Sequence, residues 1–298
     1  MDITALRSFR EVHRTGSLTA AARALGYTQS ALSRQIAALE AELGTPLLRR
    51  HARGVRPTPA GDVLLEHAAA ILQRVDHAER DVRASRDRPV TNLRVGSVPS
   101  AAAALLPPAL GAFRAAEPQV RVTFAEDVTP RLLPRLLDGE LDLAVITSYP
   151  PGLPAQTDLT LTHLLDDVLV CVLPREHPAA ALPVLPLAEL ADETWVEDYA
   201  GAASALATAC ARAGFTPRID IECGSWLGKQ AFVAAGHGVA LAPRLLVPAL
   251  RQDLAIRELA DPPRRGVYAA TRRRPGVAAE AAAAFRRALT ETVGATTS

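Results

Sequence analysis

Lysine is almost missing from this chain of 298 residues: Lys229 is the only one, and arginine supplies the other basic side chains. There are 33 basic and 32 acidic residues, so the formal net charge is +1. This balance excludes a protein that binds nucleic acid through bulk charge alone. Any affinity for phosphate groups must come from a local patch, and arginine must provide it.

Cysteine and long apolar runs are also scarce. Cys171, Cys210 and Cys223 are too few and too widely spaced for a disulfide framework or a zinc site. No run of eighteen apolar residues occurs, so a membrane-spanning helix and a membrane partner are not expected. The opening MDITALRSFR carries charges where a signal peptide has its apolar core, which predicts a cytoplasmic protein.

Catalytic, nucleotide-binding and metal-binding sequence motifs are missing as well. The seven histidines show no metal-ligand spacing, and no P-loop, GxSxG or HExxH pattern is present. We therefore expect no catalytic residues, no metal site and no cofactor.

Charge is unevenly distributed along the chain. At about 100–200 residues per domain, the length predicts two or three folded units. Residues 1–90 contain 14 arginines and 10 acidic residues, a net charge of +4, whereas the remainder has a net charge of −3. Segment 44–58 contains four arginines and no acidic residue. This asymmetry favours an N-terminal nucleic-acid module, although a solvated loop would show the same local run of charge.

The first sixty residues predict three helices. Residues 3–14 have helical apolar spacing, Ser17 can cap a second helix, and Thr28 can cap a third. The exposed start of the third helix is polar and could enter a major groove. It consists of Gln29, Ser30, Ser33 and Arg34. An ordinary three-helix bundle with a solvated face is the alternative.

The run GSLTAAARALGYTQSALSRQIAALEAELGTPLLRR closely resembles the winged helix-turn-helix of LysR-type transcriptional regulators. Ala31 and Leu48 depart from the pattern, since the family often has Pro and Phe there. The resemblance implies that residues 1–58 bind DNA and that 46–58 form a wing. It also implies two sets of contacts. The groove contacts are Gln29, Ser30, Ser33 and Arg34, and the contacts to phosphates or the minor groove are Arg50, Arg53 and Arg56.

A long helix is predicted over residues 59–88. Thr58 is a capping residue and Pro59 suits the first helical position. From Leu64 to Val82 the apolar residues follow heptad spacing, which favours pairing with a second copy. An amphipathic helix packed on its own domain is the alternative. LysR-type regulators dimerise through a helix at this position, so the resemblance implies a homodimer or homotetramer.

From residue 92 onward, short apolar runs alternate with helical segments, which predicts an α/β unit with a mainly parallel sheet. Sequence segments such as DGELDLAVI and VAAGHGVALAPRLLV resemble the effector-binding domain of the same family, which has a type II periplasmic-binding-protein fold. The expected fold class is thus α plus α/β. Lobe I would comprise about 92–164 and 267–298, and lobe II about 165–266.

Ligands of such folds bind at the carboxyl ends of strands and at helix N-termini. By resemblance, the residues lining the effector cleft are Ser100, Thr129, Thr147, Ser204 and Trp226. The hydroxyls could instead be helix caps. Thr147 is neutral where some family members have a cation, which weakens the case for a dicarboxylate. We expect Lys229 on the surface and the cysteines to be buried and unreactive.

These features predict a homo-oligomeric regulator that binds double-stranded DNA and responds to a small molecule held between two lobes. A solute-binding protein would not explain the N-terminal module. An enzyme would need a catalytic set that the sequence does not contain.

Overall fold

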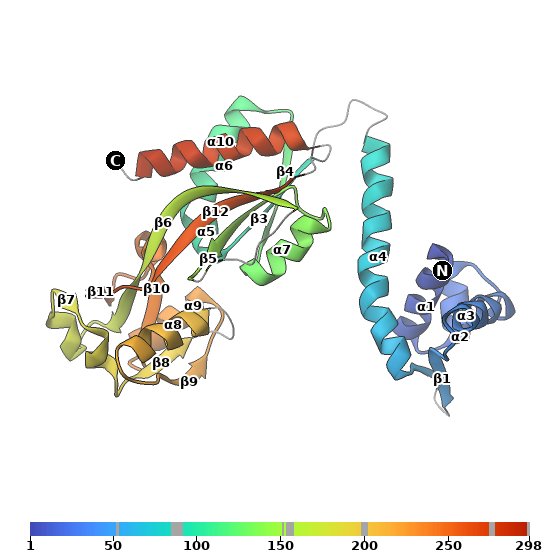
Figure 1. Cartoon of the computed structure of the whole chain (residues 1–298), viewed down its shortest axis with the longest axis horizontal. Helices are drawn as coiled ribbons and strands as arrows, with labels where there is room; N and C mark the ends of the chain where they lie inside the picture. Colours follow the sequence, from blue (N-terminus) through green and yellow to red (C-terminus); the bar gives the residue numbers. More distant parts are fainter. Residues whose placement is uncertain are drawn as a thin grey trace. The chain divides into compact units, whose positions relative to one another are not determined.

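The computed structural model describes residues 1–51, 54–84, 92–150, 152, 158–197, 202–273 and 278–296. It forms two compact units, Met1–Pro89 and Val90–Ser298 (Figure 1). Arg53 lies outside the described residues, and so do the side chains of Arg50 and Ser204.

The first unit begins with three helices, as the apolar spacing predicts. They are α1 (Ile3–Thr15), α2 (Leu18–Leu25) and α3 (Gln29–Leu43). Ser17 caps α2 by accepting a hydrogen bond from the amide of Ala20 at 3.3 Å, and Thr28 caps α3 through the amide of Ala31 at 3.2 Å. Phe9 is fully buried at the centre of the three-helix core. The caps and this core fix the direction of α3.

A two-stranded antiparallel ribbon follows, formed by β1 (Leu48–His51) and β2 (Gly54–Pro57). Glu40 of α3 ties it to the helices by accepting hydrogen bonds from the amides of Leu47 and Leu48 at 2.7 and 3.0 Å. Gly54 has φ +134°, and a Cβ there would lie 2.3 Å from the carbonyl oxygen of Gly16. Glycine is therefore required where the ribbon meets the turn between α1 and α2.

Helix α4 (Pro59–Ala84) starts at the predicted proline, and Thr58 Oγ1 accepts a hydrogen bond from the Gly61 amide at 3.1 Å. Part of its predicted heptad seam packs within the unit, because the seam residue Ala68 is buried with Leu6 and Leu72, and the seam residues Leu64 and Ile71 pack against this cluster. Further along, Val82 is 63% exposed. The alternative of packing on its own domain thus holds for the first half of the helix.

The second unit contains a mixed sheet that runs through both lobes (Figure 1). In lobe I the strand order is β4-β3-β5-β12-β6, with β4, β3 and β5 parallel and β12 antiparallel to both of its neighbours. The strands are β3 (Asn92–Ser97), β4 (Arg121–Glu126), β5 (Leu143–Ser148), β6 (Leu159–Pro174) and β12 (Arg264–Arg272). The sheet is thus mixed where the sequence predicted a mainly parallel one, because β12 runs against the direction of both β5 and β6.

Helices cover both faces of the lobe I sheet. They are α5 (Pro99–Ala104), α6 (Leu106–Ala116), α7 (Thr129–Leu137) and α10 (Ala279–Thr296). Figure 1 shows α6 and α10 together on one face and α7 on the other. Phe113 of α6 and Phe285 of α10 meet edge to face at 5.3 Å between ring centroids. This contact closes the lobe I core.

Lobe II is built on the continuation of β6. Its other strands are β7 (Val184–Leu185), β8 (Thr194–Glu197), β9 (Arg218–Glu222), β10 (Ala240–Pro243) and β11 (Leu254–Leu259). Its helices are η1 (Pro178–Ala181), η2 (Leu187–Leu190), α8 (Ala202–Arg212), α9 (Trp226–Ala234) and η3 (Arg244–Ala249). Strand β6 pairs with β12 up to Val168 and with β10 from Leu169. The two lobes therefore share one continuous strand.

Candidate DNA-binding face and effector cavity

The N-terminal end of α3 presents an exposed polar surface. Gln29, Ser30 and Arg34 are exposed, and Ser33 is half-buried. Within the residues that the structure describes, Arg34 pairs with no carboxylate. Its guanidinium therefore has the reach and the free donors to contact a guanine edge or a phosphate.

The ribbon after α3 brings two arginines into direct opposition. Arg49 on β1 is the cross-strand partner of Arg56 on β2, and both are exposed. Like charges directly opposite on a ribbon repel, and a phosphate between them offsets that cost. The sequence prediction included Arg56 but omitted Arg49. Side chains of a strand alternate between its two faces, and this alternation was the sequence signal that could have placed Arg49 on the exposed face of the ribbon.

The second unit contains a cavity of about 360 Å³ between its lobes. Four of the five predicted effector residues line it: Ser100, Thr129, Thr147 and Trp226. Much of the remaining wall is apolar. It includes Val98, Val128, Leu169, Leu241 and Pro243. The fifth predicted residue, Ser204, cannot be placed because its side chain lies outside the described residues.

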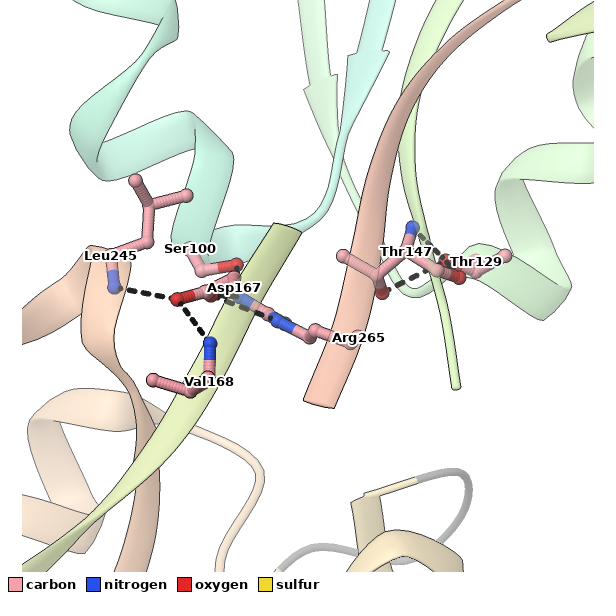
Figure 2. Close-up of polar contacts among 7 residues, drawn as sticks. All are labelled: Ser100, Thr129, Thr147, Asp167, Val168, Leu245 and Arg265. Carbon is pink, nitrogen blue, oxygen red and sulfur yellow. Dashed lines mark hydrogen bonds and ion pairs between the residues drawn. The ribbon is translucent and has the colours of Figure 1, made fainter. Parts of the chain in front are cut away.

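The hydroxyls of this cavity are not helix caps. The N-cap residues of α5 and α7 are Val98 and Val128, one or two positions before Ser100 and Thr129. Thr129 Oγ1 instead accepts a hydrogen bond from the Thr147 amide at 3.0 Å and donates to the Thr147 carbonyl at 3.2 Å. This pair fixes the start of α7 against the end of β5 (Figure 2).

A buried ion pair that the sequence did not reveal lies beside Ser100. Arg265 donates through Nε and Nη2 to Asp167 Oδ2 at 3.0 and 2.7 Å, and through Nη2 to Ser100 Oγ at 2.8 Å. Asp167 Oδ1 accepts from the amides of Val168 and Leu245 at 3.0 and 3.3 Å. Figure 2 shows this network linking α5 of lobe I to the first turn of η3 in lobe II.

Tyr149 also lines the cavity near Arg265. Burial raises the pKa of its phenol, and the charge and hydrogen bond of Arg265 oppose part of that rise. Tyr149 is therefore a neutral hydroxyl at physiological pH, able to donate to or accept from a ligand.

Lobe II contributes a second buried ion pair. Lys229 of α9 binds Glu197 of β8, and each side chain is 3% exposed. The Lys229 ammonium also lies 4.9 Å from the ring centroid of Trp226, a cation–π contact. The sequence prediction of a surface lysine was therefore wrong. Its partner, 32 residues away, was not recognised from the sequence.

All three cysteines are free thiols in the structure. Cys171 and Cys210 are buried, and burial raises the pKa of Cys210 to about 12. Cys223 is half-buried and packs with a different cluster from Cys210. The prediction of unreactive cysteines is supported for the first two, because a thiol that stays protonated is a poor nucleophile.

The architecture thus defines a class of protein, a DNA-binding helix-turn-helix unit joined to a two-lobed α/β ligand-binding domain. Comparison of the sequence with known protein families agrees with this class. Residues 3–62 match the bacterial regulatory helix-turn-helix proteins of the lysR family, and residues 86–294 match the LysR substrate binding domain. The chain belongs to the LysR family of bacterial transcriptional regulators.

A probable hydrogen peroxide-inducible genes activator of Mycobacterium avium is 34% identical over 267 residues, which cover 87% of this chain and 84% of that protein. The solved structure of a Corynebacterium glutamicum OxyR C206 mutant is 27% identical, with a TM-score of 0.59 and coverage of 99% and 94%. Full-length CbnR in complex with its target DNA gives a TM-score of 0.72 at 23% identity, covering 98% and 100%, and shows the fold.

The predicted fold class and function are confirmed. The chain is a DNA-binding transcriptional regulator, and a small molecule bound between the two lobes modulates its activity. In the described residues, no helix is both long enough and apolar enough to span a bilayer.

Proposed function

We propose that this regulator senses a small molecule with one anionic group and an apolar body. The cavity lining presents two cations, Arg265 and Lys229, and one carboxylate, Glu197. Each cation is paired with a carboxylate, Lys229 with Glu197 and Arg265 with Asp167, but Asp167 is not part of the lining, so Arg265 faces the cavity without a carboxylate beside it there. One anionic group of a ligand can bind this side of Arg265, and the apolar wall accommodates the rest of the molecule.

Helix geometry supports an anion at the same place. The first turns of α5, α7 and α9 contribute Ser100, Thr129 and Trp226 to the lining. Amide groups at helix starts favour negative charge, which adds to the effect of the two cations. The neutral Thr147 adds a hydroxyl and no charge, which favours a monoanion over a dianion. The cavity volume of about 360 Å³ fits a compact metabolite.

Mass spectrometry of protein purified from its host under native conditions tests this function. The wild type should retain a small anion that denaturation releases with its mass unchanged, since we propose a binding site and no enzyme. Thr147→Leu fills the cavity and should abolish retention. Thr160→Leu is the matched control, because Thr160 is exposed on β6. Equal retention by wild type and Thr147→Leu would place the ligand elsewhere.

For the DNA contacts, we propose that Gln29, Ser30, Ser33 and Arg34 contact bases, and that Arg50, Arg53 and Arg56 contact phosphates or the minor groove, as the family resemblance implies. We add Arg49, because it opposes Arg56 on the exposed ribbon. We further propose domain boundaries of 1–58, 59–88 and 92–298, pairing through the exposed part of α4, and a cytoplasmic location.

Fluorescence anisotropy with a duplex from the promoter region beside its gene tests these contacts. Arg34→Ala should lower specific affinity about tenfold to a hundredfold, the loss of a base contact worth about 1–3 kcal/mol. Arg49→Gln and Arg56→Gln should weaken specific and nonspecific binding alike, and each should reduce the salt slope by about one. The exposed Arg114 of α6 is the control. If Arg34→Ala binds like Arg114→Ala, the assignment of α3 is wrong.

A further inference from the structure

We propose that lobe I has a second ligand site, specific for a tetrahedral oxyanion such as a phosphoryl group, between α10 and the end of β12. A cavity of about 100 Å³ lies there, lined by Asp142, Thr271, Arg272, Arg286 and four alanines of the α10 region. This site is independent of the effector cavity and of the function proposed for it.

The two cavities lie at opposite ends of the same strands. On β12, Arg265 lines the effector cavity and Thr271 lines the second one. Six residues of strand separate them, roughly 20 Å at 3.3 Å per residue. In the same way, Thr147 lies near the end of β5 and Asp142 directly precedes its first residue. One small molecule of the size that the effector cavity admits cannot occupy both.

Positive charge is in excess at the second cavity. The one carboxylate in its wall, Asp142, is already bound by Arg94, through Nε to Oδ2 at 2.9 Å and through Nη2 to Oδ1 at 2.8 Å. Arg272 Nη2 lies 3.9 Å from Asp142 Oδ1, at the limit of an ion pair. Arg286 bonds to a neutral hydroxyl, Thr162 Oγ1, at 3.2 Å, and within the described ranges it pairs with no carboxylate.

The arginines are held in place by features of the fold. Gly139 has φ +76°, and a Cβ at that position would lie 2.6 Å from Arg272 Nη1, so the guanidinium of Arg272 packs directly against this glycine. The hydrogen bond to Thr162 orients Arg286 from the opposite side. Short alanine side chains at 278, 279, 282 and 283 leave the space between them open.

Two guanidinium groups facing one small cavity repel each other, and an anion bound between them removes that repulsion. Guanidinium donors match the oxygens of phosphate in geometry and charge. The volume equals that of about three water molecules, which admits one tetrahedral oxyanion. A phosphate ester can bind with its phosphoryl group inside and its organic part in solvent.

Isothermal titration calorimetry of the full-length protein in chloride buffer, at matched ionic strength, tests the site. The ligands are inorganic phosphate, sulfate and glycerol phosphate. We expect saturable binding of one anion per chain. Arg286→Gln and Arg272→Gln should each weaken it at least tenfold. Arg287→Gln is the matched control, since Arg287 is the exposed neighbour on α10, and it should stay within twofold of wild type.

Ala283→Asp is a second variant that does not rely on removing an arginine. It supplies an internal carboxylate between the two guanidiniums, so it should raise the melting temperature and abolish phosphate binding. Thr147→Leu should bind phosphate like wild type, because it alters only the effector cavity. Tighter binding of glycerol phosphate than of free phosphate would identify an ester as the natural ligand, and the reverse would identify the free ion.

Three results would overturn the proposal. One is the absence of saturable binding to the wild type. Another is unchanged binding in both Arg286→Gln and Ala283→Asp. The last is loss of phosphate binding in Thr147→Leu, which would assign the anion to the effector cavity.

Discussion

Replacing Arg265 with glutamine breaks the ion pair that joins the lobes beside the effector cavity. Arg265 is 6% exposed and Asp167 is 5% exposed, so the substitution leaves a buried carboxylate without its cation. Removing one partner of a buried pair costs about 3–5 kcal/mol of folding free energy. Asp167 still accepts hydrogen bonds from the amides of Val168 and Leu245, so we expect the loss of folding free energy to lie at the lower end of this range, about 3 kcal/mol.

Urea unfolding of the full-length chain, followed by tryptophan fluorescence, measures this loss. Both tryptophans, Trp195 and Trp226, lie in the second unit, so the signal reports the unit that contains the pair. Arg264→Gln removes an exposed charge from the adjacent position and should change stability by less than about 0.5 kcal/mol.

The double variant Asp167→Asn with Arg265→Gln separates the pair from other effects of the substitution. It replaces the buried carboxylate by an amide, so it should recover at least about 2 kcal/mol relative to Arg265→Gln alone. A loss below about 1 kcal/mol in Arg265→Gln, or a double variant as unstable as the sum of both single variants, would show that the ion pair does not stabilise the second unit.

Two further predictions concern the wing and the thiols. Gly54→Ala should displace the wing and weaken DNA binding, because of its backbone angle and its contact with Gly16, at a cost of about 1–3 kcal/mol. The helical Gly111 has open space around its Cβ position, so the control Gly111→Ala should stabilise the protein by about 0.5–1 kcal/mol. Denaturant unfolding followed by circular dichroism, together with DNA binding, checks both glycine variants. Burial raises the pKa of Cys210 to about 12, so its thiolate fraction at pH 8 is about one part in ten thousand, and iodoacetamide with peptide mapping should modify Cys223 alone. Because folding raises that pKa, the free energy of unfolding that the protonated Cys210 thiol contributes is complete below about pH 8.5 and declines as pH rises toward 12. Rapid labelling of Cys210 at pH 8 would contradict the raised pKa.

Sequence prediction succeeded where the signal is local. Ser17, Thr28 and the Thr58-Pro59 pair mark helix starts through contacts within three residues, so each start follows from the sequence alone. Ser100, Thr129 and Thr147 each lie at a strand or helix end and line the cavity, and their role as effector contacts stays a prediction.

Prediction failed where chemistry depends on pairs distant in sequence. Asp167 and Arg265 are 98 residues apart and meet only because β6 and β12 pair. Lys229 was expected in solvent, and it is buried because β8 places Glu197 beside it. The continuation of β6 into both lobes was missed as well, since strand pairing over such separations leaves no mark in a single sequence.

A DNase footprint on the promoter region beside its gene, with and without a small-molecule extract of the host, tests most directly whether a small molecule in the cavity controls DNA binding. We expect the extract to alter the wild-type footprint, and we expect Thr147→Leu to give the same footprint without extract and no response to it. A wild-type footprint unchanged by the extract, or a Thr147→Leu footprint that still responds, would show that the cavity does not control DNA binding.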